Sequence, residues 1–449
     1  MIWHLFRKKV KSIVDESFGE SMIKYLTILA VFITVTTMVM SCHSSKAEND
    51  TKNISYWTAP SLELSKFESK VVEEWNLSHP DSRIDWKTIP AGTTSEEVLL
   101  TAIATRTGPD ICSNIFGGFA AQLADAKVLV ALDTMPGFWD VMEKRNMANI
   151  IRNNWFYNGH VYVIPVYVNP EQMWYNKKML DKQGIAELPR TYLEFFTLLD
   201  EVCTSQNVYG LTVDISSKWY KRWFDYLTLY AAAAGGEPYI NVKEKEALFD
   251  NQAGIAVTEF FFNVFEKGYA PRFDIQDGFQ KEMFLASIKG AGDITRVKRM
   301  YPDLEYVIAP LIVPDYYPVN APVYTMAESK GMVLFNNTHN KQQAWDFMKW
   351  YFNDSHDSLW LELTNYLPAR EDLVSNPIFT EYFNNNPDIK SYAETLDFSV
   401  PLVLTPQTVE IQTILNRELW QPIIFGLKTP SAASRDANQT IRRILKSGP

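Results

Sequence analysis

Aromatic and polar side chains follow two predicted strands of this chain. Trp57 and Thr58 end a short strand that begins at Ile54, and Ser113 and Asn114 follow a strand entered through Gly108-Pro109-Asp110-Ile111. An indole face can stack on the apolar C–H face of a sugar ring, and hydroxyl or amide groups can bond its hydroxyls. Trp57 is thus a candidate stacking platform and Asn114 a candidate hydroxyl partner. A packed tryptophan and a capping asparagine remain equal alternatives.

The elements that would position these side chains alternate between strand and helix patterns. After the first strand, apolar residues recur at helical spacing from Leu64 to Trp75, and residues 83–89 alternate as a second strand. Thr94-Ser95-Glu96-Glu97 is a capping box that opens a second helix. This alternation predicts βαβ units and a parallel sheet, whose strands contact ligands at their carboxyl ends.

Catalytic signatures are absent from the sequence. It contains no G-x-S-x-G, H-E-x-x-H, G-x-x-x-x-G-K-(S/T) or G-x-G-x-x-G motif, and its six histidines include no pair at metal-ligand spacing. We therefore expect no catalytic residues, no metal and no cofactor.

The bulk composition indicates an ordinary globular chain of two lobes or domains. The chain has 449 residues, against roughly 100–200 residues for a typical domain. The formal net charge is −10, and no basic run occurs after residue 42. Nucleic acid is therefore not an expected partner. The 13 Trp, 22 Tyr and 26 Phe favour a sugar ligand only weakly, because a core can absorb many of them.

Residues 1–42 have the pattern of an export signal. Lys24 precedes an apolar stretch, Tyr25–Met40, of about sixteen residues, shorter than the roughly 20 that a spanning helix prefers. Val39-Met40-Ser41-Cys42 resembles the lipobox of bacterial lipoproteins, which implies cleavage before Cys42 and lipidation of its sulfur. Three acidic residues precede Met22, so we expect translation to start at Met22. An uncleaved single-span anchor is the alternative, and residues 43–53 would form a tether.

Residues 159–185 contain two apolar alternating runs, Val161–Val168 and Gln172–Tyr175, separated by Asn169-Pro170. Such runs around a proline favour an edge or crossing strand. The segment resembles the pattern G-x-x-Y-x-(I/L)-P-(Y/V), then (M/L)-(W/Y)-Y-N-K, of the family 1 extracellular solute-binding proteins, the sugar-capturing subunits of ABC importers. In that family it crosses between two lobes and lines the ligand cleft, which implies a ligand contact for Tyr167. An ordinary strand and helix of another α/β protein is the alternative.

Further matches to that family follow in the same order as far as about residue 430. After Gly210-Leu211 the family presents an aromatic side chain to the cleft, which implies Trp219 or Trp223. An aromatic stripe at helical spacing is more often core than ligand site, however. Where the family usually has a cleft tryptophan this chain has Ile294, and the preceding Asp293 could bond ligand hydroxyls or pair with a cation. Arg370, in a segment similar to the family's L-P-(A/V)-R, could reach the cleft or form a structural ion pair.

The resemblance implies a two-lobed α/β fold of the type II periplasmic-binding-protein kind, with a ligand cleft between lobes joined by crossover strands. We expect residues 54–165 plus about 325–368 to form the N-terminal lobe, and residues 166–324 plus about 369–449 the C-terminal lobe.

The implied function is capture of a carbohydrate, in particular an oligosaccharide, by a monomer held outside the cytoplasmic membrane, or in the periplasm, through lipid on Cys42. Its partners would be the ligand and the permease subunits of an ABC importer. Two alternatives stay open from the sequence: an exported glycoside hydrolase that uses a carboxylate pair, and a sensor that presents its liganded form to a membrane receptor.

Overall fold

The first three strands form the expected parallel layer. The computed structural model describes residues 53–92 and 94–447. β1 (Ile54–Thr58) pairs in parallel with β2 (Ile84–Thr88) on one side and with β3 (Ile111–Ile115) on the other. Between them run α2 (Leu62–Ser78) and α3 (Ser95–Ala104). The apolar residues whose spacing predicted α2 are buried: Leu64, Phe67, Val71 and Trp75.

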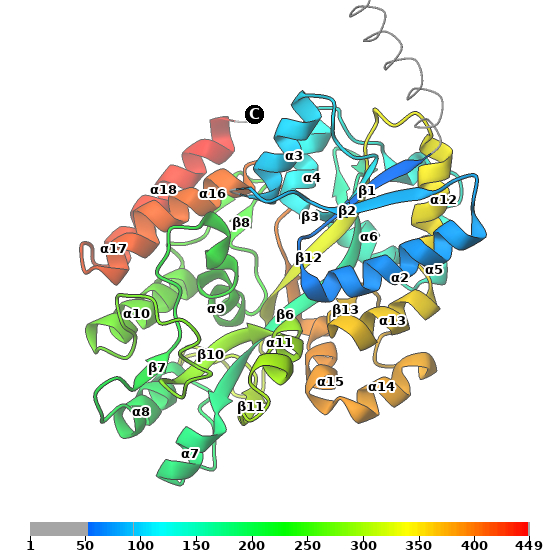
Figure 1. The fold of residues 1–449 in the computed structure, drawn as a ribbon. Helices are drawn as coiled ribbons and strands as arrows, with labels where there is room; N and C mark the ends of the chain where they lie inside the picture. The colour runs from blue at the N-terminus through cyan, green and yellow to red at the C-terminus, as the bar shows by residue number, and fades with distance from the viewer. Residues whose placement is uncertain (1–52, 93, 448–449) are drawn as a thin grey trace, which may run out of the picture. The chain divides into compact units, whose positions relative to one another are not determined.

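β6 (Ile164–Asn176) is one continuous strand that changes its pairing partners along its length (Figure 1). From Ile164 to Pro170 it pairs antiparallel with β12 (Thr325–Leu334), and from Glu171 to Tyr175 it pairs antiparallel with β10 (Phe284–Gly290). The sequence predicted two runs broken at Asn169-Pro170. The strand passes through Pro170 because this residue, which has no N–H to donate, lies where one partner ends and the next begins.

The described strands assemble mainly into one mixed sheet with the order β2-β1-β3-β12-β6-β10-β7. Three further strands join the sheet beside this order: β11 and β13 pair with β6, and β14 pairs with β12. The other strands of this sheet are β7 (Tyr209–Leu211), β11 (Tyr306–Ala309), β13 (Leu367–Pro368) and β14 (Ser399–Pro401). Two pairs of short strands lie outside it: β4 (Phe156–Tyr157) pairs with β5 (His160–Val161), and β8 (Ile240–Asn241) pairs with β9 (Glu246–Ala247).

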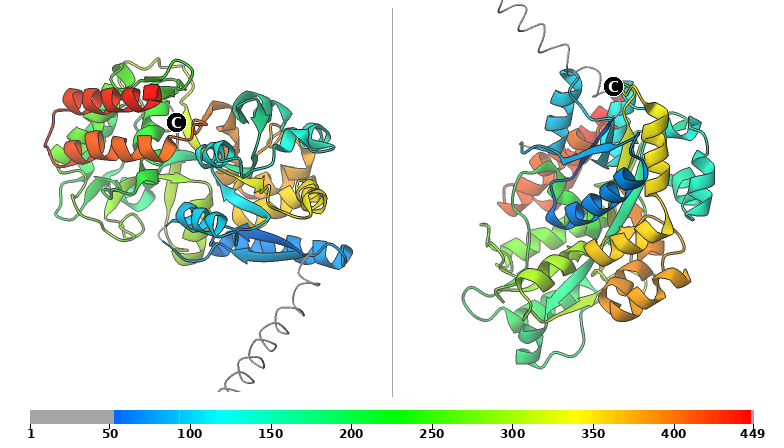
Figure 2. Two further views of the ribbon diagram at one scale, coloured as in Figure 1. Left: turned by 90° about the horizontal axis from the view of Figure 1, so that it is seen from above. Right: turned by 45° about the vertical axis from the view of Figure 1, so that its right-hand side comes forward.

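Helices flank this sheet, and none in the described ranges is long and apolar enough to cross a membrane. α8 opens with the capping box predicted from Thr191 and Glu194. In Figure 2 the C-terminal helix α18 (red) lies beside α16, and both α18 and α9 pack against α10. The α-helices after α3 are α4 (Gly117–Asp125), α5 (Phe138–Lys144), α6 (Ala148–Asn154), α7 (Lys177–Gln183), α8 (Tyr192–Val202), α9 (Tyr226–Ala233), α10 (Gln252–Glu266), α11 (Gly292–Met300), α12 (Lys341–Tyr351), α13 (Asp354–Thr364), α14 (Thr380–Asn385), α15 (Pro387–Glu394), α16 (Thr408–Ile414), α17 (Gln421–Ile424) and α18 (Pro430–Ser447).

Shorter helical turns connect these helices. They are the 3₁₀ helices η1 (Leu132–Thr134), η2 (Trp219–Trp223), η3 (Pro377–Phe379) and η4 (Leu396–Phe398), and the π-helix η5 (Leu415–Trp420). The predicted lobe boundary near residue 165 falls inside β6, and the one near 325 coincides with the start of β12. The exact lobe boundaries remain a prediction.

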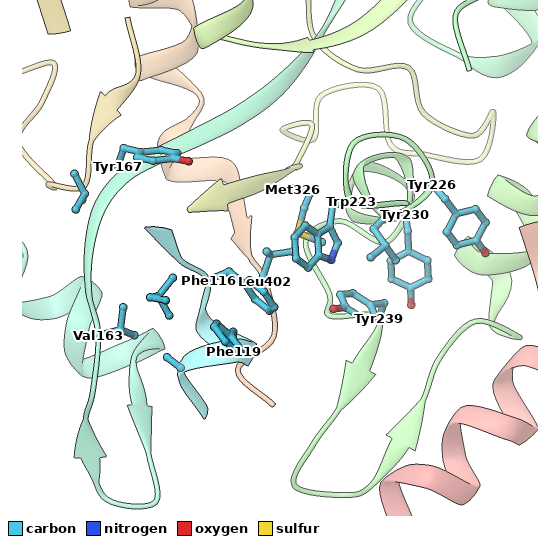
Figure 3. Close-up of a cluster of buried hydrophobic side chains, with 14 of the residues drawn as sticks. Phe116, Phe119, Val163, Tyr167, Trp223, Tyr226, Tyr230, Tyr239, Met326 and Leu402 are labelled. Atoms are coloured by element: carbon cyan, nitrogen blue, oxygen red, sulfur yellow. The ribbon is translucent and has the colours of Figure 1, made fainter. Parts of the chain in front are cut away.

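The larger core cluster joins aromatic residues from distant parts of the chain (Figure 3). Phe116, directly after β3, packs against Trp223 of η2 with ring centroids 5.3 Å apart. Tyr226 and Tyr230 continue the cluster along α9. Because this apolar contact links residues after β3 to η2, it helps to fix η2 beside the carboxyl ends of the parallel strands.

A buried ion-pair network holds the segment that follows β13. Asp357 accepts hydrogen bonds from Arg145 (Nη2 to Oδ1, 2.6 Å) and from Arg370 (Nη1 to Oδ2, 2.9 Å). All three residues are less than 5% exposed: Arg145 3%, Asp357 4% and Arg370 3%. Arg370 also bonds Asp354 and Asp372, so its guanidinium is satisfied by ion pairs within this network.

Replacement of Asp357 by alanine should destabilise the protein by about 3–5 kcal/mol, because it leaves two guanidiniums buried near each other without their shared carboxylate. The matched control is Asp181→Ala. That residue forms an exposed ion pair with Lys177 (side chains 45% and 56% exposed), so we expect a loss of about 0–1 kcal/mol. Urea unfolding of the purified variants measures both. Equal losses would contradict the structural role of the network.

Candidate ligand-binding site

Three adjoining cavities lie beside β6 and β12, and we call them together the cleft. Cavity A has a volume of about 700 Å³, and cavity B one of about 470 Å³. Phe224 and Glu328 line both of them. Cavity C is smaller, and it shares Asn114 and Lys330 with cavity A. Cavities A and B adjoin through these shared residues, so one extended ligand could contact both. Cavity C, with about 10 Å³, is a small extension of cavity A.

Aromatic residues form one wall of cavity A. Trp219, Tyr220 and Trp223 of η2 line it, together with the following Phe224. The Trp219 ring lies 5.0 Å from Trp223 and 5.4 Å from Phe116, and its side chain is partly exposed. Trp223 is only 2% exposed, and its indole N–H has no hydrogen-bond partner among the described residues. This wall offers ring faces for stacking.

A buried arginine anchors η2 from behind. Arg222 is fully buried, with its guanidinium carbon 3.8 Å from the centroid of Trp420. Its Nη2 donates to the carbonyl of Asp214 (2.6 Å) and forms an ion pair with Asp225 (2.9 Å). These contacts hold the aromatic wall without occupying the side of η2 that lines the cavity.

Polar residues at the ends of the parallel strands line cavities A and C. Thr58 and Ser113 line cavity C, and Asn114 lines both. Thr58 already accepts a hydrogen bond from the indole of Trp86 (3.0 Å). The Asn114 side chain makes no hydrogen bond to any described residue and is partly exposed, so its amide is available to a ligand.

Glu68 lies at cavity C, where two tyrosines hold it. The hydroxyls of Tyr56 and Tyr351 donate to its two carboxyl oxygens at 3.0 and 3.1 Å. Burial raises the pKa of Glu68 to about 8, although both hydrogen bonds oppose the rise. Glu68 is therefore largely protonated below neutral pH.

Acidic side chains dominate cavity B. Glu171 of β6, Asp293 of α11 and Glu328 of β12 line it. Glu171 is 4% exposed, and burial followed by the charges of Asp293 and Glu328 raises its pKa well above the usual range. Burial also raises the pKa of Glu328, with Lys330 opposing and Asp293 adding to the rise.

The structure brings seven of the nine predicted ligand-contact residues to the cleft: Thr58, Ser113, Asn114, Tyr167, Trp219, Trp223 and Asp293. Tyr167 is 6% exposed and packs beside Tyr366, with ring centroids 4.8 Å apart. Ile294, at the position of the missing tryptophan, is fully buried. The roles of the seven residues in binding remain predictions.

Trp57 and Arg370 do not line the cleft. Successive strand residues point to opposite faces, so Thr58 faces cavity C while Trp57 packs in the core, with Lys87 Nζ 4.8 Å from its ring centroid. Arg370 takes the structural alternative and lies in the ion-pair network described above. The predicted lipidation site, Cys42, lies outside the described residues.

The sequence interpretation missed Glu171, Glu328 and Lys330. All three lie on β6 or β12 and line the cleft. Charged residues inside strands that otherwise read as buried are the signal that could have identified them. Among the described residues, no group of three or more His, Cys, Asp or Glu is placed to hold a metal ion.

Comparison with known proteins gives matches over most of this chain. Residues 70–390 match the family described as bacterial extracellular solute-binding protein. The chain is 25% identical over 356 residues to a maltotriose-binding protein of Pyrococcus abyssi (strain GE5 / Orsay), covering 77% of this chain and 71% of that protein. It is also 25% identical over 167 residues to an arabinooligosaccharide-binding protein of Bacillus subtilis (strain 168), covering 35% and 36%.

Solved structures confirm the predicted two-lobed α/β fold. An uncharacterized protein of Listeria monocytogenes EGD-e superposes with a TM-score of 0.77 at 29% identity, covering 88% of this chain and all of that one. A cyclic alpha-maltosyl-1,6-maltose binding protein of Arthrobacter globiformis superposes with a TM-score of 0.74 at 20% identity, covering 88% and 99%.

The pKa of Glu68 predicts a pH-dependent stability. A carboxyl whose pKa is raised from 4.5 to about 8 on folding stabilises the protein below pH 4.5, and this stability is lost as the pH rises to about 8. Glu68→Gln has no carboxyl group to ionise at this position. The free energy of unfolding of the variant should therefore increase, relative to that of the wild type, as the pH rises from 5 to 8, by at most about 1.4 kcal/mol per pH unit. Urea unfolding at both pH values measures the gain.

The control is Glu73→Gln, which changes an exposed glutamate of the same helix and should leave the pH dependence unaltered. An identical pH dependence in wild type and Glu68→Gln would contradict the raised pKa.

Proposed function

Because the chain belongs to the bacterial extracellular solute-binding proteins, we propose that its solute is a carbohydrate, in particular an oligosaccharide, bound in the cleft for delivery to an ABC importer. One observation carries the proposal: a wall of aromatic rings, Trp219 to Phe224, lies in the same cavity as the free amide of Asn114. Sugars need such a pairing of ring faces and hydrogen-bonding groups. The names of the maltotriose- and arabinooligosaccharide-binding relatives support the same ligand class.

Ligand capture would work by closure around the crossover strands. Asn114 and Trp219 come from parts of the chain before and after β6, and both line cavity A. A sugar that contacts both sides is bound more tightly by the closed form than by the open one, and it shifts the equilibrium by that difference. The closed form would then be recognised by the permease, and no covalent bond of the sugar would change.

The family acts outside the cytoplasm, and lipid on Cys42 is our proposal for what keeps the protein near its permease. As a tether between the lipid and the domain, residues 43–53 would allow the domain to meet both its solute and the permease. A receptor-linked sensor would use the same cleft and differ only in its partner.

Isothermal titration calorimetry of the purified protein against mono- and oligosaccharides, with chromatographic product analysis of each mixture, tests the ligand class. We expect saturable binding of an oligosaccharide and no new product. Turnover would favour the glycoside hydrolase alternative, and no binding of any sugar would overturn the proposed ligand class.

Replacement of Trp219 by alanine should weaken binding of the sugar identified in that screen by about 1–3 kcal/mol, because a stacking face is lost. The control is Trp139→Ala. This tryptophan is partly exposed and packs against Phe156 and Arg152, away from the residues that line the cleft. Calorimetry measures both affinities. Unchanged affinity for Trp219→Ala would place the sugar elsewhere.

A further inference from the structure

The acidic side chains of cavity B exceed its basic ones. Seven acidic and three basic residues line this cavity. Three of the acids have ion-pair partners: Asp214 with Lys221 (3.0 Å), Asp225 with Arg222 (2.9 Å) and Glu63 with Arg299 (2.6 Å). The lining acids that form no ion pair with any described residue are Glu171, Asp274, Asp293 and Glu328. These four acids lack a paired counter-charge in the described protein, and a cationic ligand would supply one.

Glu171 is the least explained of these acids. It is more than nine-tenths buried, and its carboxylate has neither a hydrogen bond nor an ion pair among the described residues. Unpaired buried carboxylates are costly, and they are rare outside sites that bind something. Asp293 accepts only the backbone N–H of Gly290 (3.2 Å), and Glu328 has no hydrogen-bonded partner in the described chain.

The nearby cations of the protein do not compensate these carboxylates. Lys289 lies with its Nζ 5.9 Å from the ring centroid of Phe279 and 6.0 Å from that of Trp174. Lys330 lies with its Nζ 5.1 Å from the ring centroid of Phe116. Neither approaches an acidic oxygen of the described residues within 4.0 Å, although Lys289 and Lys330 lower the pKa of Glu171 and Glu328 respectively. A cation from outside is the partner that this cavity lacks.

We infer that the ligand is a saccharide with a free primary amine, and that its ammonium group binds among Glu171, Asp293 and Glu328. This inference rests on the proposed function. Cavities A and B share Phe224 and Glu328, so an uncharged ring can stack on the wall of cavity A while an amino sugar ring occupies cavity B. An ammonium group fits better than a metal ion, because it brings three donors to carboxylates that are not arranged as metal ligands.

The burial energetics agree with this assignment. Burial and the charges of Asp293 and Glu328 both oppose ionisation of Glu171. A bound ammonium favours the ionised form of Glu171, and the charge-assisted hydrogen bonds that result are stronger than the neutral ones a hydroxyl would make. A neutral sugar would supply no such counter-charge.

Matched ligand pairs test the inference on the purified full chain. Each pair consists of an oligosaccharide of glucosamine or galactosamine and its N-acetylated counterpart. N-acetylation keeps the sugar ring but removes the positive charge. The corresponding neutral hexose oligosaccharide is measured as a third ligand. Calorimetry should show that an amine-bearing member binds about tenfold or more tightly than both uncharged members. The preference should fall with added salt.

Glu171→Gln should reduce that preference at least about fivefold, because the ammonium loses one charged acceptor. Glu362→Gln is the control, since it removes the same charge from an exposed residue that does not line the cleft. Should Glu171→Gln fail to fold, Glu328→Gln tests the same site.

The outcomes separate this inference from the proposed function. Uncharged sugars that bind as tightly as their amine-bearing partners would overturn the inference and leave carbohydrate capture standing. A preference that survives both glutamine substitutions would overturn the assigned site. Binding of no sugar, charged or neutral, would overturn the proposed function itself.

Discussion

The continuous pairing of β6 is the constraint on which the rest of the structure depends. Its first half is hydrogen-bonded to β12 and its second half to β10 and β11, and the exchange occurs where Pro170 has no N–H to offer. Because the backbone is satisfied on both sides of this point, the strand passes through the interior without a loop. Side chains of β6 and β12 can then line cavities A, B and C along the sheet.

The cleft differs from the core in how its polar groups are satisfied. In the network of Arg145, Asp357 and Arg370, buried charges find one another. In the cleft, the Glu171 carboxylate and the Asn114 amide have no partner within the described protein. A protein that binds a polar solute must leave such groups unmatched until the solute arrives, which lowers its stability without ligand and raises its affinity with it.

Local patterns predicted most of the fold and much of the site. Helical spacing identified α2, the capping box identified α8, and strand ends identified Thr58, Ser113 and Asn114. The position of Trp57 was harder, since one residue along a strand turns a side chain from the cavity to the core. Arg370 could not be placed, because its partner Asp357 binds Arg145, which lies far away in the sequence. Glu171 could have been noticed as a charge inside a buried strand, but its lack of a partner depends on three separate elements and cannot be deduced locally.

The return of β12 to a place between β3 and β6 also has a consequence for biosynthesis. β3 ends at Ile115, but its antiparallel neighbour begins only at Thr325. The sheet therefore keeps an open edge until most of the chain has left the ribosome, and contacts of such long sequence separation form slowly. Late closure therefore prolongs the time for which the chain stays unfolded, and for a member of a family that acts outside the cytoplasm this leaves longer for export before folding.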